Sequence, residues 1–224
     1  MLWDWWTTRN KCNAGELERT TEQVCHVVQR HVIEFVPWVK RVLSETPISN
    51  NEACLRSGWE RPKENLTKVN FDAAFHQSTA SGAWGFVART DGGEFVAAAA
   101  GKLRHLHDAL QAEAEACVAA IEGAEALGLH RVVFESDSLT LVQALNTSSH
   151  ELSAIGVILR EARSNCIAAF DSFDFIFCPR KCNRIAHTLA QYGLRAEDEC
   201  VGWADVAPPI VSDLVASELA ASSG

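Results

Sequence analysis

The sequence predicts an α/β protein whose mixed β-sheet has five strands and is flanked by helices. Three observations support this fold class. Three β-prone segments follow one another, two further β-prone segments alternate with helical patterns, and 47% of the 224 residues are hydrophobic. Strands joined by short turns pair antiparallel, whereas strands joined through helices lie parallel. The apolar content is sufficient for one core without disulfides or a structural metal.

The first three strands form an antiparallel meander. The residues of Thr67–Phe75 alternate in polarity, as expected of a strand with one buried face. Ala83–Arg89 and Glu94–Ala100 are the second and third strands. The Asp-Gly-Gly sequence at 91–93 separates these two strands and is a strong hairpin signal.

A long helix follows the meander. Asp108 has the residue type of an N-cap, the helical apolar spacing continues to about Leu127, and Gly128 supplies the stop. The elements after it are a strand, two helices, a last strand and a last helix: Arg131–Glu135, Ser138–Leu145, Leu152–Asn165, Phe173–Phe177 and Asn183–Tyr192.

The composition changes on both sides of these elements. The chain divides into a Trp-rich helical segment, a linker, the α/β domain and an acidic tail: residues 1–43, 44–65, 66–195 and 196–224. We interpret Trp3, Trp5 and Trp6 as a hydrophobic anchor for a neighbouring domain, with stacking on nucleobases as the alternative. The tail contains six Asp and Glu and no Lys or Arg, and a short amphipathic helix is expected near its end.

The chain carries a net charge of −9, with an isoelectric point near 5.4. Lys and Arg drive phosphate binding, so this balance alone argues against extensive contact with nucleic acid. The tail supplies −6 of the −9, however, so the total charge says little about the domain.

No segment of the sequence indicates a membrane protein. The N-terminus contains Asp4 and lacks the apolar run of a signal peptide, and no run of about 18 apolar residues occurs. We therefore expect an intracellular protein, in the nucleus or the cytoplasm. No basic localisation run distinguishes these two compartments.

The eight cysteines are expected to be reduced thiols, because no secretory signal accompanies them. Cys117 lies in a helical apolar pattern and is interpreted as a core residue. Cys178, Cys182 and His187 form the pattern C-x3-C-x4-H, which is half of a zinc site. A fourth ligand at suitable spacing is missing, which disfavours zinc here.

Three carboxylates occupy positions that need an explanation. Asp72 lies inside the first strand, where Asp is disfavoured. Asp137 follows a buried strand at its carboxyl end, where sites assemble in open α/β sheets, although capping of the next helix is an equal alternative. Glu113 falls on the apolar stripe of the long helix together with Leu110 and Cys117, and burial there is costly without a partner or a metal.

Three such carboxylates are the ligands that a hard divalent cation requires. Mg²⁺ prefers oxygen ligands and retains several of its waters. Two such ions about 4 Å apart can activate a water and stabilise the leaving oxygen of a phosphodiester. The pattern therefore predicts a divalent-metal site of the kind that can act on a phosphodiester.

Five blocks of the sequence, within Leu66 to Gly193, resemble the ribonuclease H type 1 domain in order. They are VNFDAAF, GAWGFVAR, DALQAEAEACVAAIEGAEALG, VVFESDSLTLVQAL and CPRKCNRIAHTLA. Within that family they are most similar to the plant branch found at the C-terminus of non-LTR retrotransposon polyproteins. The resemblance implies a ribonuclease H-like fold and cleavage of the RNA strand of RNA–DNA hybrids with two Mg²⁺ ions and no small-molecule cofactor.

The resemblance also implies roles for individual residues. Asp72, Glu113 and Asp137 would be metal ligands, and His187 stands where the family usually has a fourth acid. Imidazole suits Mn²⁺ better than Mg²⁺, which places the second metal in question. The remaining implied contacts are with the nucleic acid, by phosphate binding or at the 2′-hydroxyls: Arg180, Lys181, Arg184 and Asn183.

Two other functions stay open at this point. The first is a nucleic-acid-binding or protein-interaction remnant of a retrotransposon polyprotein, with little or no catalysis, which His187 and the missing loop histidine of the family favour. The second is an adaptor that binds other proteins through the Trp-rich segment and the acidic tail.

Overall fold

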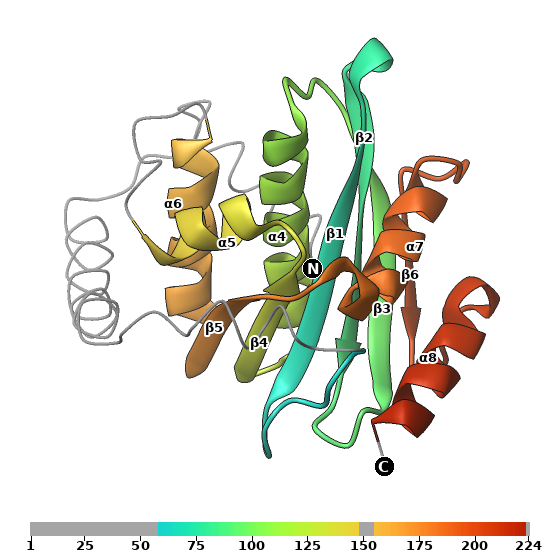
Figure 1. The fold of residues 1–224 in the computed structure, drawn as a ribbon. Helices are drawn as coiled ribbons and strands as arrows, with labels where there is room; N and C mark the ends of the chain where they lie inside the picture. The colour runs from blue at the N-terminus through green and yellow to red at the C-terminus, as the bar shows by residue number, and fades with distance from the viewer. Residues whose placement is uncertain (1–57, 148–154, 223–224) are drawn as a thin grey trace. The chain divides into compact units, whose positions relative to one another are not determined.

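A mixed sheet of six strands forms the centre of the computed structural model, which describes residues 58–147 and 155–222 (Figure 1). The strands are β1 Thr67–His76, β2 Ser81–Arg89, β3 Phe95–Leu103, β4 Arg131–Ser136, β5 Ser172–Phe177 and β6 Cys200–Ala204. The helices are α4 Ala109–Ala126, α5 Leu139–Asn146, α6 Gly156–Ala169, α7 Arg184–Gly193 and α8 Pro209–Ala221, with short 3₁₀ turns at Gln77–Thr79 and Arg180–Cys182. The segment 1–43 and most of the linker lie outside the described residues.

The strand order is β5-β4-β1-β2-β3-β6. β1, β2 and β3 pair antiparallel as a meander, while β4 is parallel to both β1 and β5. The predicted α/β class is therefore confirmed, with three antiparallel strands and two parallel ones in the expected order.

The predicted strand count is wrong by one. β6, taken from the region interpreted as an acidic tail, pairs antiparallel with β3 along Ala97–Gly101. A Gly and only five residues give β6 little signal of its own, and its pairing partner lies about a hundred residues earlier in the chain. α8 confirms the expected helix near the C-terminus, but it begins at Pro209, earlier than anticipated.

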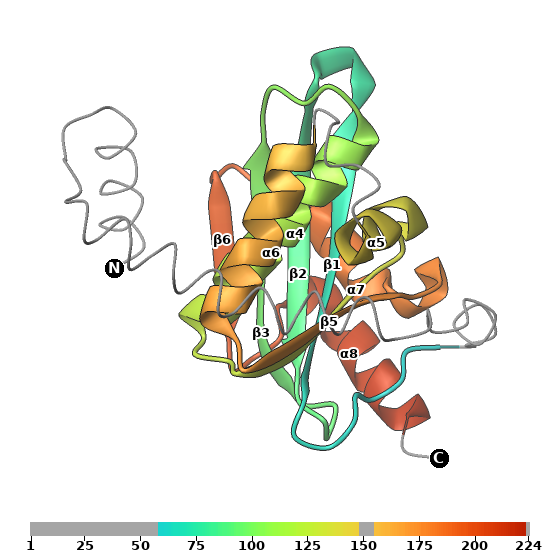
Figure 2. The same ribbon diagram turned by 90° about the vertical axis from the view of Figure 1, so that its left-hand side faces the viewer.

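Helices cover the two faces of the sheet (Figures 1 and 2). Two neighbouring residues of β2 show which helix packs on which face. Gly85 meets the backbone of Leu189 and Ala190 in α7, and the ring of Phe86 lies against Gly123 in α4. Side chains alternate along a strand, so α4 and α7 pack on opposite faces. α6 packs on α4, and α8 joins α7 and β3 in a common apolar cluster.

The helix ends largely follow the sequence. Asp108 caps α4 by accepting a hydrogen bond from the Gln111 amide at 2.8 Å, and Gly128 after the helix has a φ of +67°. At α5 the cap is Ser138, which accepts from the Leu141 amide, so Asp137 does not serve as the cap. α6 begins at Gly156, and residues 152–154 of the predicted helix lie outside the described part.

A buried ion pair fastens α8 to the sheet. Arg89, 1% exposed, donates from Nη1 to Oε2 of Glu218 at 2.7 Å and from Nη2 to Oδ1 of Asn70 at 3.0 Å. The ring of Trp59 lies 3.7 Å from the guanidinium, and its Nε1 donates to the same Asn70 oxygen. Residues on both sides of the predicted 66–195 range therefore complete its core.

The two ends of the described chain meet near this ion pair. Arg61 Nε donates to Ser222 Oγ at 3.2 Å.

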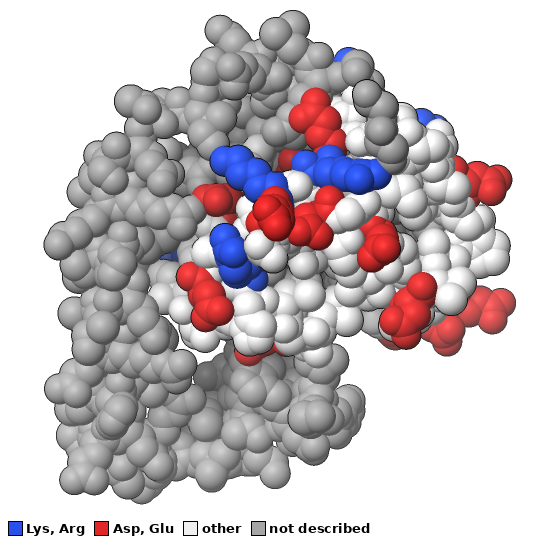
Figure 3. Space-filling model, turned by 90° about the horizontal axis from the view of Figure 1, so that it is seen from below, with Lys and Arg blue, Asp and Glu red and all other residues white. Residues whose placement is uncertain are grey.

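Figure 3 views this end of the domain from below and shows acidic side chains spread over its described surface with basic ones between them. This end offers no continuous basic surface among the described residues. Within that same part of the chain, no helix has the length and apolar content needed to cross a membrane.

Candidate active site

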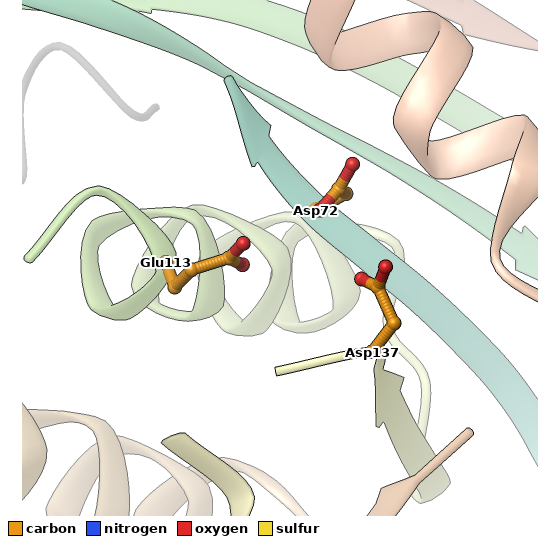
Figure 4. Close-up of side chains that lie close together, drawn as sticks. All are labelled: Asp72, Glu113 and Asp137. Atoms are coloured by element: carbon orange, nitrogen blue, oxygen red, sulfur yellow. The ribbon is translucent and has the colours of Figure 1, made fainter. Parts of the chain in front are cut away.

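Three carboxylates come together where β1 extends past the end of β4. The pairing of β1 with β4 ends at Asn70 opposite Glu135, so Asp72 lies beyond it at an open edge. Asp137 follows β4, and Glu113 reaches the same place from α4 (Figure 4). One oxygen from each of the three lies within 4.8 Å of the others. Among the described residues, no other group of His, Cys, Asp and Glu has this arrangement.

The donor set fits a hard divalent cation. All three donors are carboxylates, which Mg²⁺ and Mn²⁺ accept and which softer metals do not require. Oε2 of Glu113 is buried and has no hydrogen-bond partner among the described residues. An unpaired buried carboxylate oxygen beside two more carboxylates is costly, and a bound cation would remove that cost.

Proton affinities at the site reflect the crowding of like charges. Burial, and then the charge of Asp137, raise the pKa of Asp72 to about 6, although His187 opposes this shift. Burial, and then the charges of Asp72 and Asp137, raise the pKa of Glu113 well above its usual range. The site therefore retains protons that a cation would displace.

His187 lies on α7 directly beside Asp72. Its Nδ1 is 2.7 Å from Oδ2 of Asp72, and the side chain is 31% exposed. The Arg180 guanidinium lies 3.1 Å from Nε2 of the same ring. Nη2 of the same guanidinium also lies 3.3 Å from Nδ1, so Arg180 contacts both ring nitrogens.

Arg180, Lys181 and Arg184 are all exposed at the start of α7. Arg180 also lies near the acids, with Nη1 3.6 Å from Oδ2 of Asp137. Asn183 does not share their exposure: its side chain is buried, with 1% exposed, and it donates to protein acceptors. Protein atoms surround the amide in this structure, and the expected contact of Asn183 with the nucleic acid stays a prediction.

The alternative zinc site is not formed by its three residues. Cys178 and Cys182 are buried, and Cys182 donates to the carbonyl of Gly58, while His187 turns to Asp72. Burial raises the pKa of the Cys178 thiol, which disfavours the thiolate that zinc needs. The three side chains form no metal-ligand group in the described structure. Cys117 is a fully buried core thiol, as predicted.

A depression of about 310 Å³ opens beside two of the carboxylates. It is lined by Ala109, Leu110, Glu113, Asp137, Ser138, Thr140 and Arg180. The hydroxyl-bearing residues Ser138 and Thr140 were not singled out in the sequence, where they read only as the start of a helix. A volume of this size beside the acids can admit a polar group of a substrate.

Comparison with known proteins agrees with this geometry. A family model described as reverse transcriptase-like matches residues 70–193, which is more than half of the chain. The chain belongs to the reverse transcriptase-like family. The match runs from β1 to the end of α7 and includes the three carboxylates and His187. It ends before β6 and α8. None of the curated proteins matches the sequence.

Solved structures of ribonucleases H share the fold. The chain is similar to ribonuclease H1 from the halophilic archaeon Halobacterium salinarum, with a TM-score of 0.50 and 26% identity, covering 58% of this chain and 98% of that one. It is also similar to LC11-RNase H1 isolated from compost, with a TM-score of 0.54 and 16% identity, covering 58% of this chain and 96% of that one. The fold of this member of the family is ribonuclease H-like.

Proposed function

We propose that this protein is a divalent-metal-dependent endonuclease that hydrolyses the RNA strand of RNA–DNA hybrids. The observation that carries the proposal is the convergence of Asp72, Glu113 and Asp137 within 4.8 Å at an open strand edge. The ribonuclease H-like fold and the likeness to an archaeal ribonuclease H1 support the choice of reaction. The sequence blocks support an origin in the plant retrotransposon branch.

The three carboxylates would hold the metal, with Mg²⁺ as the expected ion and two ions in the complete site. Bound divalent cations supply the activation of a water and the stabilisation of the leaving oxygen of a phosphodiester. Asp72 lies between Glu113 and His187, so its carboxylate is the one positioned to serve both sides of the site. Burial of Asp72, at 2% exposed, keeps the carboxylate out of bulk water.

Exposed cations would position the substrate. Arg180 and Lys181 in the 3₁₀ turn before α7, and Arg184 at its first position, are exposed. In this proposal they bind phosphates without reading base sequence. Arg180 lines the depression beside the acids, so a phosphate bound by it lies next to the metal ligands. With three such contacts we expect binding to weaken steeply as salt increases.

His187 affects the choice of metal in this proposal. Imidazole is a poor ligand for Mg²⁺ and a better one for Mn²⁺. His187 already contacts Asp72, so a second ion beside Asp72 would meet the ring. We therefore expect faster cleavage with Mn²⁺ than with Mg²⁺.

The direct test is cleavage of a labelled RNA–DNA hybrid by the full chain with Mg²⁺ and with Mn²⁺, alongside Asp72→Asn. Cleavage of the RNA strand alone, lost in Asp72→Asn, is the expected result. RNA duplex and DNA duplex of the same sequence serve as substrates that should stay intact. Failure of folded protein to cleave the hybrid with either ion would refute the proposal.

A binding protein without catalysis is the second candidate. The observation that favours it is the pair of contacts that Arg180 makes with His187 and Asp137, which place a cation of the protein itself beside the acids. Hybrid binding by wild type in the absence of any cleavage would establish this alternative. Absence of binding as well, with a protein partner recovered through residues 1–43, would favour an adaptor.

A further inference from the structure

We propose that Asn183 is a positioning residue that fixes Asp137 for metal binding; this inference rests on the proposed metal-dependent function. Asn183 precedes α7 and is 1% exposed. Its Nδ2 donates to Oδ1 of Asp137 at 3.1 Å and to the backbone carbonyl of Phe71 at 2.9 Å. Phe71 is the residue before Asp72, so one amide links two of the three metal-ligand positions.

The orientation of this amide is determined by its neighbours. Both groups that it contacts, a carbonyl and a carboxylate, are acceptors, so the NH₂ end must face them. The opposite end, Oδ1, is buried without a hydrogen-bond partner among the described residues. A buried carbonyl oxygen without a hydrogen bond costs free energy. The amide keeps this orientation in spite of that cost, because its NH₂ group bonds the two acceptors.

Two more ordinary roles do not account for Asn183. Asn is common as an N-cap, but this side chain makes no cap hydrogen bond to the first turn of α7. Direct contact with nucleic acid requires exposure, which the buried amide lacks. The remaining role is the one that its two hydrogen bonds describe.

The contact selects which oxygen of Asp137 is available. Oδ1 is held by Asn183, whereas Oδ2 faces the exposed Arg180 guanidinium at 3.6 Å. The Asn183 bond thus fixes the direction in which Oδ2 points, toward the open side of the site. Groups that hydrogen-bond a metal-ligating carboxylate orient it, and their loss typically weakens metal affinity by about 10- to 100-fold.

The test is a calorimetric titration of the full chain with Mn²⁺, comparing wild type, Asn183→Ala and Asn183→Leu. Leu has the same number and branching of side-chain heavy atoms as Asn and lacks its donors, so it keeps the site filled if the Ala variant fails to fold. We expect about 10-fold or greater weakening of Mn²⁺ binding in each folded variant. Binding of a hybrid in EDTA should stay within about 2-fold of wild type, since the Asn183 side chain is buried.

The matched control is Asn146→Ala. Asn146 also donates its side-chain amide to a backbone carbonyl, that of Phe175 at 2.9 Å, but it touches none of the three carboxylates. Its loss should lower stability without changing Mn²⁺ affinity. Folded Asn183→Leu that binds Mn²⁺ as tightly as wild type would overturn the positioning role alone. Wild type that does not bind Mn²⁺ would overturn both this inference and the metal-dependent function.

Discussion

Replacing Asp72 by Asn should stabilise the ion-free protein at neutral pH. The folded structure raises the pKa of Asp72 from an ordinary 3.8 to about 6. A carboxyl with a raised pKa contributes stability below its unfolded pKa, and this contribution is lost as the pH rises through the folded value. At 1.36 kcal/mol per pKa unit, ionisation of Asp72 costs up to about 3 kcal/mol above pH 6.

Asn removes this cost and keeps an oxygen that can accept from His187. Urea unfolding in EDTA at several values between pH 4.5 and 7.5 measures the difference between Asp72→Asn and wild type. We expect the difference to grow by about 1–3 kcal/mol over this range, in favour of the variant. Asp198→Asn makes the same chemical change at an exposed loop position and should show no such growth. A difference that does not change with pH would refute the electrostatic reasoning.

Other perturbations test separate parts of the structure. Glu218→Ala leaves Arg89 buried without its carboxylate and should lower the free energy of unfolding in urea by about 3–5 kcal/mol, whereas Asp213→Ala, an exposed control, should lower it little. Equal losses of stability in the two variants would show that the ion pair does not hold α8. Gly85→Ala places a methyl group against the α7 backbone and should destabilise the fold by about 1–3 kcal/mol, while Gly92→Ala should be nearly neutral in the same measurement. A Gly85→Ala variant as stable as wild type would mean that α7 can move away from β2. Arg180→Ala should weaken hybrid binding in fluorescence anisotropy and tighten Mn²⁺ binding, because it removes a cation beside Asp137. Unchanged ion affinity would remove Arg180 from the immediate surroundings of the site.

Local patterns were sufficient for most of the fold. The strand at β1, the turn at 91–93 and the cap at Asp108 depend on neighbours in sequence, and all three are present. The expectation of one buried face for β1 is wrong, because helices cover both faces of the sheet and Lys68–Asp72 are all buried. β6 and the Arg89–Glu218 pair depend on segments about a hundred residues apart or more, so no local window contains their cause. For the same reason the tail looked separate from the domain that it completes.

The candidate site was predictable where a residue type conflicted with its surroundings. Asp72 in a strand and Glu113 on a packing face are such conflicts, and the structure brings both to one place. The contact of Asn183 with Asp137 was not predictable in this way, because a polar residue before a helix does not conflict with its surroundings. Its burial and its bond to Asp137 arise only when β1, β4 and α7 are assembled.

The meeting of Arg61 with Ser222 has a consequence for how such a domain can be carried within longer chains. Both attachment points leave the sheet at one end, the end where Trp59 and Glu218 enclose Arg89. Chains whose termini lie close together tolerate insertion into a host protein and removal from it. We therefore expect the domain to fold when it is fused through either end, provided that residues 59 and 218 are included in it.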